Sequence, residues 1–168
     1  NMTLNNYIFY FVILALSSGC GLYSFSGSSI PKSAKTVHIK ETQNNTLLSN
    51  PELTQLITES LNNYILTETN LKTSTQNPDL LFAGKITKYT VNPISINAEN
   101  NASQNRLMIE VEMSYKNTTD TLNNFTRKFS NYIDFDSSEN FLDVERELNE
   151  LIVDKLVEDI FYASFSNW

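Results

Sequence analysis

The chain has 168 residues, of which 40% are hydrophobic and 18% charged, so it is long enough to form one globular domain with a buried core. Its formal net charge of −7 and the lack of a Lys/Arg run argue against nucleic acid as a partner, because clustered cations are needed to bind a phosphate backbone. One cysteine and one histidine cannot form an internal disulfide and leave a zinc site without ligands, so we expect no metal.

An uncharged apolar segment, Tyr7 to Leu16, lies near the start of the chain. It is about half as long as the ~20 residues of a membrane-spanning helix and matches the hydrophobic core of a signal peptide. Small residues occupy positions 17–19, and Cys20 follows them, an arrangement that resembles the lipobox of bacterial lipoproteins. We therefore predict a lipoprotein signal peptide over 1–19 and a lipid anchor on Cys20. An ordinary cleaved signal peptide and a buried N-terminal helix are the alternatives.

The predicted anchor determines where the rest of the chain resides. Two or three acyl chains on Cys20 hold a protein stably at a membrane, since each buried methylene contributes about 0.8 kcal/mol. Residues 21–29 contain no acidic residue, and by analogy with other lipoproteins this favours the outer membrane, with the domain facing the periplasm. We expect residues 20–34 to form an extended, lipid-anchored lead-in and residues 35–168 to form a single domain.

The domain is predicted to begin with a strand and a helix. Apolar and polar residues alternate over Lys35–Glu41, as in a strand with one buried face. His38 falls on the polar phase and is expected to be an exposed strand residue. Asn50 and Pro51 are typical of the cap and first position of a helix, and apolar residues then recur at helical spacing up to Ile65.

Three strands are predicted next, over Asp79–Asn97, Leu107–Lys116 and Phe125–Phe135. In the first of them the apolar phase changes near Thr87 and Lys88, which predicts a bulge or twist there. Polar loops separate the three strands, so we expect antiparallel hairpins.

A final helix is predicted after Asn140, where apolar residues recur at helical spacing from Phe141 to Ala163. The order strand, helix, three strands, helix predicts a right-handed parallel crossover followed by antiparallel strands. We therefore expect an α+β fold, an α/β sandwich in which two helices cover one face of a four-stranded, mixed, mostly antiparallel sheet. The other face of the sheet carries a mixture of Lys, Glu and Thr.

Catalytic motifs are few. Asp134 and Asp136 point the same way on a strand and could in principle act as acid and base, which keeps a hydrolase open as an alternative. No histidine lies near them in sequence, and they precede a helix, whose N-terminus favours acidic residues. The sequence has no glycine-rich phosphate loop and no nucleophile elbow. We therefore interpret the pair as structural and the chain as non-enzymatic, without a cofactor.

Cationic side chains on or beside the strands are candidates for binding phosphate groups of a lipid headgroup, although scattered solvated charges are the alternative. Arg106 belongs to this set, and the candidates we retain are Lys85, Lys88, Arg127 and Lys128. Separately, the Asp120–Leu122 sequence DTL resembles a short O-glycosylation signal of some Bacteroidetes, which makes Thr121 a candidate modification site.

Several segments spread over nearly the whole mature chain carry a family pattern: residues 20–39, 50–65, 84–96, 105–115, 129–141 and 156–168. Together they resemble the LptE-type lipopolysaccharide-assembly lipoproteins, in the version found in Bacteroidetes. The resemblance implies a non-enzymatic outer-membrane lipoprotein that sits in the lumen of the LptD β-barrel. There it serves as plug and assembly partner and helps to pass lipopolysaccharide to the cell surface.

The surface predicted from the sequence is compatible with this role. A barrel lumen is polar and lined by water, so an acidic surface rich in Asn and Thr suits it. The main alternative is a freestanding periplasmic lipoprotein that binds a lipid or small ligand between the helices and the sheet. Such a protein would have a sizeable internal pocket.

Overall fold

The computed structural model describes residues 30–31, 33–47, 51–94 and 103–165. Cys20, the predicted signal peptide and the predicted cap Asn50 therefore lie outside the described residues. The elements, in chain order, are β1 (Thr36–Asn44), α2 (Pro51–Glu68), β2 (Lys72–Thr73), β3 (Leu80–Ile94), β4 (Gln104–Asn117), the 3₁₀ turn η1 (Thr121–Asn123), β5 (Phe125–Asp136) and α3 (Phe141–Phe165).

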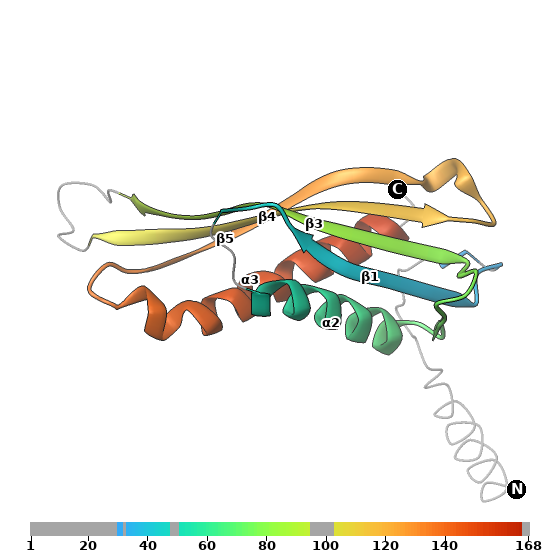
Figure 1. Cartoon of the computed structure of the whole chain (residues 1–168), viewed down its shortest axis with the longest axis horizontal. Helices are drawn as coiled ribbons and strands as arrows, with labels where there is room; N and C mark the ends of the chain where they lie inside the picture. Colours follow the sequence, from blue (N-terminus) through green and yellow to red (C-terminus); the bar gives the residue numbers. More distant parts are fainter. Residues whose placement is uncertain (1–29, 32, 48–50, 95–102, 166–168) are drawn as a thin grey trace, which may run out of the picture.

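The strands form one mixed sheet with the order β2-β1-β3-β4-β5. β1 is parallel to β3, as the strand–helix–strand crossover predicted, and the β3–β4 and β4–β5 pairs are antiparallel. Both helices lie on the same side of the sheet (Figure 1). The predicted fold class is therefore confirmed.

The strand count was wrong, because the sheet has five strands rather than four. After α2 the chain runs parallel to β1 for two residues, and the N–H of Lys72 donates to the carbonyl of Lys35 at 3.0 Å. The N–H of Ser74 then donates to the carbonyl of Val37, also at 3.0 Å. A two-residue strand has no alternation, so no hydrophobic period marks it in the sequence.

The bulge predicted in the long third strand is confirmed, with a register shift between Ile86 and Lys88. The extra residue returns Tyr89 to the helix-covered face, where it is 6% exposed. Its hydroxyl donates to Glu145 at 2.7 Å and to Asn149 at 3.2 Å, so β3 is joined to α3 by buried polar contacts.

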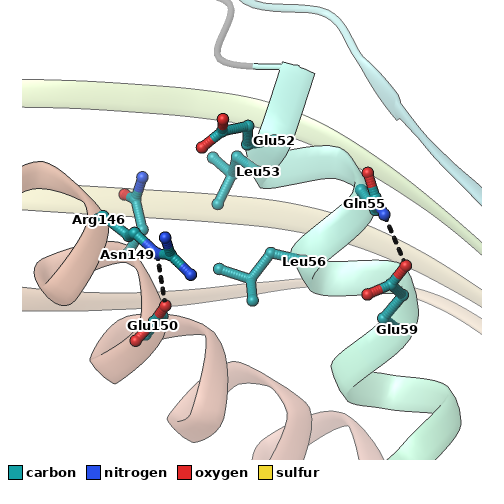
Figure 2. Close-up of a pocket in the computed structure, with 8 residues that line it drawn as sticks. All are labelled: Glu52, Leu53, Gln55, Leu56, Glu59, Arg146, Asn149 and Glu150. Carbon is teal, nitrogen blue, oxygen red and sulfur yellow. Dashed lines mark hydrogen bonds and ion pairs between the residues drawn. The ribbon is translucent and has the colours of Figure 1, made fainter.

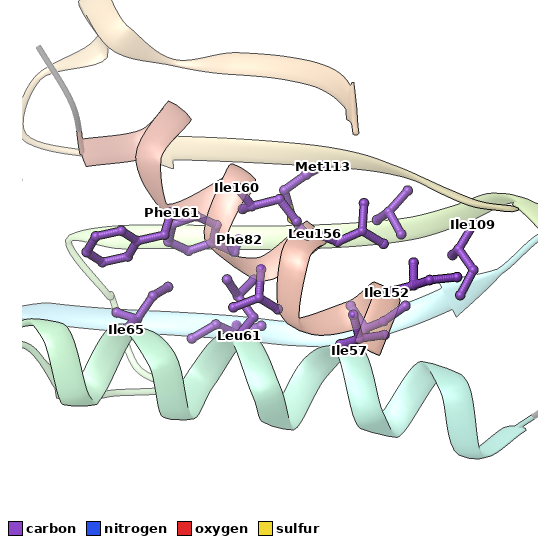
Figure 3. Close-up of a cluster of buried hydrophobic side chains, with 14 of the residues drawn as sticks. Ile57, Leu61, Ile65, Phe82, Ile109, Met113, Ile152, Leu156, Ile160 and Phe161 are labelled. Carbon is purple, nitrogen blue, oxygen red and sulfur yellow. The ribbon is translucent and has the colours of Figure 1, made fainter. Parts of the chain in front are cut away.

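The core fills the layer between the sheet and the two helices (Figure 3). Residues of α2 spaced four apart contribute Leu53, Ile57, Leu61 and Ile65, each at most 2% exposed. Figure 3 shows Ile152, Leu156, Ile160 and Phe161 of α3 meeting Phe82, Ile109 and Met113 of the sheet. This continuous apolar layer supplies most of the folding free energy, because burial removes apolar area from water.

The predicted start of the last helix is confirmed. The N–H of Leu142 donates to Oδ1 of Asn140 at 3.3 Å, and the N–H of Asp143 donates to the Asn140 carbonyl at 3.0 Å. Asn140 is therefore the N-cap of α3. Within the described part of the chain, neither α2 nor α3 is long and apolar enough to cross a membrane.

Candidate interaction surfaces

The face of the sheet opposite the helices, here named the open face, gathers three of the predicted cationic residues. Lys85 of β3 pairs with Glu112 of β4, which pairs in turn with Lys128 of β5. In the neighbouring row Lys88 pairs with Glu110. Cations and carboxylates therefore alternate across the middle of this face, as favourable cross-strand pairs do.

Glu110 is held on the open face by two side-chain hydrogen bonds. Its carboxylate accepts hydrogen bonds from the Thr87 hydroxyl at 2.7 Å and from Nζ of Lys128 at 2.9 Å. These two bonds, the Thr87 one foremost, hold the pKa of Glu110 below its usual value, and Glu110 in turn raises the pKa of Lys128. Lys128 is therefore partly neutralised, although its side chain remains 57% exposed and open to an anion.

Arg127 does not belong to this group. It shares the strand phase of Phe125 and Phe129, which places it on the helix-covered side of β5, opposite the core residue Met113. Its guanidinium lies 5.0 Å from the centre of the Phe125 ring, a cation–π contact at the edge of the sheet. The structure therefore brings Lys85, Lys88 and Lys128 together and separates Arg127 from them.

Asp134 and Asp136 do not form an acid–base pair. Asp134 accepts two hydrogen bonds from the Arg106 guanidinium, at 2.6 and 2.8 Å, and this pair lowers its pKa. Asp136 accepts from the backbone N–H and the hydroxyl of Ser138, at 2.8 and 2.7 Å, and its pKa is lowered for that reason. Both carboxylates are thus occupied by structural partners, and neither has the raised pKa expected of a general acid at neutral pH.

The Arg106 site also contains Tyr132, whose ring centre lies 3.8 Å from the guanidinium carbon. The sequence indicated Arg106 only as one of several cations on or beside the strands and did not reveal this cluster. The antiparallel register of β4 and β5 places Arg106 directly opposite Asp134, and this register is set by the tertiary structure rather than by a local pattern.

Charge is strongly divided between the two layers of the molecule. Helices α2 and α3 contain ten acidic and two basic residues, which gives the helix layer a formal charge of −8. The five strands contain eight basic and five acidic residues, which gives the sheet a formal charge of +3. An anion therefore meets a more favourable potential at the sheet than the overall charge of −7 indicates.

A shallow groove of about 300 Å³ runs between α2 and α3 on the side away from the sheet (Figure 2). Leu53 and Leu56 of α2 line it, and Figure 2 shows Leu56 pointing toward α3. Four of the polar side chains that line it are paired along their own helices, Gln55 with Glu59 at 2.7 Å and Arg146 with Glu150 at 3.1 Å. The groove lies on the outer surface between the two helices. The ligand-binding alternative requires space between the helices and the sheet, and that layer is occupied by the core.

The remaining sequence candidates lie on strands and turns. His38 lies in β1 on the phase opposite the core residues Val37 and Ile39, as expected, but it is half-buried rather than exposed. Among the described residues, no group of three or more His, Cys, Asp or Glu side chains is placed to hold a metal ion. Thr121 is exposed in η1, and the Asp120 side chain caps that turn by accepting from the Leu122 N–H at 3.1 Å. O-glycosylation of Thr121 stays a prediction.

Comparison with known proteins identifies a family. The family model described as "LptE: Lipopolysaccharide-assembly" matches residues 34–164, a range that includes every described strand, α2 and all but the last residue of α3. No curated protein matches the sequence.

Solved structures share the fold at low sequence identity. A minor lipoprotein from Acinetobacter baumannii has a TM-score of 0.50 at 15% identity and covers 76% of this chain and 90% of its own. A hypothetical protein from Chlamydia trachomatis has a TM-score of 0.55 at 8% identity, covering 80% and 100%. A protein from Xanthomonas campestris has a TM-score of 0.54 at 9% identity, covering 80% and 87%. At such identities the likeness concerns the fold alone.

Proposed function

The chain belongs to the LptE lipopolysaccharide-assembly family, and on this premise we propose that it is a non-enzymatic lipoprotein that plugs and helps to assemble the LptD β-barrel of the outer membrane. The observation that carries the proposal is the family match over 34–164, because it covers nearly the entire domain rather than one motif. Lipopolysaccharide transfer to the cell surface is the process in which the assembled pair acts.

The proposed mechanism is steric and interfacial. A plug must keep its shape inside a larger pore, and the densely packed layer between the sheet and the helices gives the domain that rigidity. The lumen of a barrel is polar, and both exposed surfaces of this domain are rich in charged and hydroxyl side chains. No step of this mechanism requires a catalytic group or a cofactor.

The open face is the proposed contact for the phosphates of lipopolysaccharide. Lys85, Lys88 and Lys128 lie in adjacent rows of the same face, and a hollow of about 300 Å³ there is lined by Lys40, Lys85 and Glu112, among others. Several ammonium groups within one patch can share the charge of a phosphorylated lipid. Arg127 is not part of this proposed contact, because it lies on the other face of the sheet.

The proposed membrane anchor is a lipid attached to Cys20. The domain is proposed to face the periplasm and to occupy the barrel lumen. A Cys20→Ala variant is then expected to stay folded but to leave the membrane fraction, as judged by fractionation. Firm membrane binding of that variant would show that the apolar N-terminal segment holds the protein instead.

Affinity purification from detergent-extracted outer membranes tests the proposal directly. A tag on this chain is expected to recover a β-barrel protein in a stoichiometric ratio, measured by quantitative mass spectrometry. The matched control is the same tag on an unrelated lipoprotein, which recovers no barrel. Recovery of this chain alone would contradict the plug role.

A further inference from the structure

One hollow lies at the end of the molecule where the described chain begins. It has a volume of about 490 Å³, within the range of sites that hold small ligands. Its residues come from the lead-in, the start of β1 and the segment after α2: Ile30, Pro31, Ala34, Lys35, Thr36, Asn70, Leu71 and Lys72. This hollow, here named the end pocket, combines an apolar part with a polar rim.

The apolar part of the end pocket continues the core. Ala34 is 9% exposed and Leu71 is 7% exposed, and Ile30 packs against the same apolar cluster. These side chains offer hydrocarbon at the bottom of a surface hollow, which suits the glycerol and first methylene groups of a lipid.

The rim of the end pocket is cationic. Lys35 and Lys72 are both exposed, and within the described part of the chain neither ammonium group forms an ion pair. The carboxylate of Asp79 lies near Lys35 and interacts with its charge. Its Oδ2 accepts from the N–H of Lys35 at 2.8 Å and from the N–H and hydroxyl of Thr36 at 2.9 and 2.8 Å, which fixes this carboxylate on the backbone at the start of β1. The other nearby acid in the sequence is Glu68, the last residue of α2.

The backbone around the end pocket is firmly held. The N–H of Ala34 donates to the Pro31 carbonyl at 2.9 Å, and the hydroxyls of Ser33 and Thr119 are hydrogen-bonded at 2.8 Å. The lead-in is therefore fastened to the β4–β5 turn as well as to β2. A ligand at this place would meet a preformed site rather than a loose segment.

The position of the end pocket along the chain indicates its partner. Ile30 follows Cys20 by only ten positions, and a fully extended chain of that length spans at most about 35 Å. If Cys20 carries the proposed lipid, this end of the molecule is confined to the neighbourhood of the membrane surface. Exposed lysines close to such a surface are attracted by anionic lipids.

We propose that the end pocket binds the phosphate headgroup of an anionic glycerophospholipid, with Lys35 and Lys72 contacting the phosphate and Ile30, Ala34 and Leu71 contacting the glycerol and acyl stems. The inference rests on the lipid anchor of the proposed function and assigns this end of the domain to the membrane surface. It adds a second, non-covalent attachment that fixes the orientation of the domain relative to the bilayer.

Hydrogen exchange of the full-length lipidated protein in nanodiscs tests this site. Discs of phosphatidylcholine alone are compared with discs that contain phosphatidylglycerol, with discs that contain lipopolysaccharide, and with phosphatidylcholine discs plus inorganic phosphate. Slower exchange in residues 33–36 and 69–73 is expected with phosphatidylglycerol only. The half-saturating fraction of phosphatidylglycerol is expected to rise about tenfold or more in a Lys35→Gln/Lys72→Gln variant.

The matched control is Arg146→Gln/Lys155→Gln, which removes the same charge from two exposed positions on α3, away from both the end pocket and the open face. It is expected to keep the wild-type response. The assignment would be overturned by equal exchange in all discs, or by a control variant whose response to phosphatidylglycerol is weakened as much as that of the Lys35/Lys72 variant. It would also be overturned if inorganic phosphate or lipopolysaccharide protected these residues in the absence of phosphatidylglycerol. Recovery of the barrel partner is measured on the same variants and is expected to be unchanged, so failure of the plug proposal and failure of the end pocket are distinguishable.

Discussion

At the scale of single residues, a few close contacts explain why particular side chains occur where they do. Gly84 lies on the helix-covered side of β3, where Thr42 of β1 and Met113 of β4 approach it from both neighbouring strands. Thr42 is only 4% exposed, and the Thr58 hydroxyl of α2 donates to its hydroxyl at 3.0 Å. The missing side chain of Gly84 therefore makes room for a polar link between β1 and α2.

Replacing Gly84 with Ala is expected to destabilise the fold by about 1–3 kcal/mol, the usual cost of overpacking a core. The added Cβ would lie 2.9 Å from Cε of Met113 and 3.1 Å from Oγ1 of Thr42, and only the methionine end can move aside easily. Denaturant unfolding monitored by circular dichroism measures the change. A Gly84→Val variant should lose more stability than Gly84→Ala. An unchanged denaturation midpoint for Gly84→Ala would contradict the packing argument.

Asp79 is expected to make stability depend on pH. Its pKa is lowered, first by the hydrogen bond from the Lys35 N–H and then by those from Thr36, so the folded state favours the charged carboxylate. The stabilisation is therefore complete above the ordinary carboxyl pKa of about 4 and is lost as the pH falls through the lower folded value. Asp79→Ala should lower the melting temperature at pH 7, and its difference from wild type should shrink below about pH 4. Asp154→Ala, an exposed helix acid, is the control.

At the scale of elements, each helix packs on the sheet through a regularly spaced stripe of apolar side chains and through one polar contact with a strand. The stripe of α2 repeats every four residues, and its polar connection is the contact between Thr58 and Thr42. The corresponding connection of α3 joins Glu145 and Asn149 to the Tyr89 hydroxyl. These buried polar pairs fix the register of the helices on the sheet, since apolar packing alone is less directional.

Truncating a residue in the middle of the apolar stripe of α2 measures how much the packing of this helix contributes to the free energy of unfolding. Ile57 is fully buried, so Ile57→Ala is expected to cost about 3 kcal/mol from lost burial and the cavity that remains. Leu142 at the start of α3 is 75% exposed, and Leu142→Ala should change stability by less than about 0.5 kcal/mol. Equal effects in denaturant unfolding would show that α2 is not packed as described.

At the scale of the whole molecule, the main result is the separation of charge into a basic sheet and an acidic helix layer. The net charge of −7 conceals this separation, because the acids of α2 and α3 outnumber the surplus bases of the strands. The proposed plug role, with its contact to a phosphorylated lipid, is compatible with such polarity, since the sheet attracts an anion while the helix layer repels it. The two surfaces of the domain are therefore suited to different neighbours.

The open face offers a direct test of that polarity. A Lys85→Gln/Lys88→Gln/Lys128→Gln variant is expected to bind lipopolysaccharide about tenfold more weakly or worse, measured by surface plasmon resonance at low salt. Arg127→Gln removes a cation from the opposite side of β5 and should have little effect. If the Arg127 variant lost as much affinity for lipopolysaccharide as the triple variant, a contact through the open face would be contradicted.

Much of the fold was predictable from local patterns. The alternation around Val37, the stripe of α2 and the cap at Asn140 each depend on a few neighbouring residues, and the structure confirms all three. The bulge between Ile86 and Lys88 was also visible, because a phase change in a strand is a local signal. The placement of Arg127 could have been read from the phase that it shares with Phe125.

Sequence alone determined four of the five strands, both helices, their order and the buried phase of each of these elements, because the periods of strands and helices are properties of adjacent residues. Only the tertiary structure decided what meets across the chain. It paired Lys72 with Thr36 to add a fifth strand, joined Asp134 to Arg106 and thereby removed a candidate acid–base pair, and placed Lys72 beside Lys35 in the end pocket. Contacts between residues far apart in sequence depend on strand register and helix packing, and no local pattern encodes these.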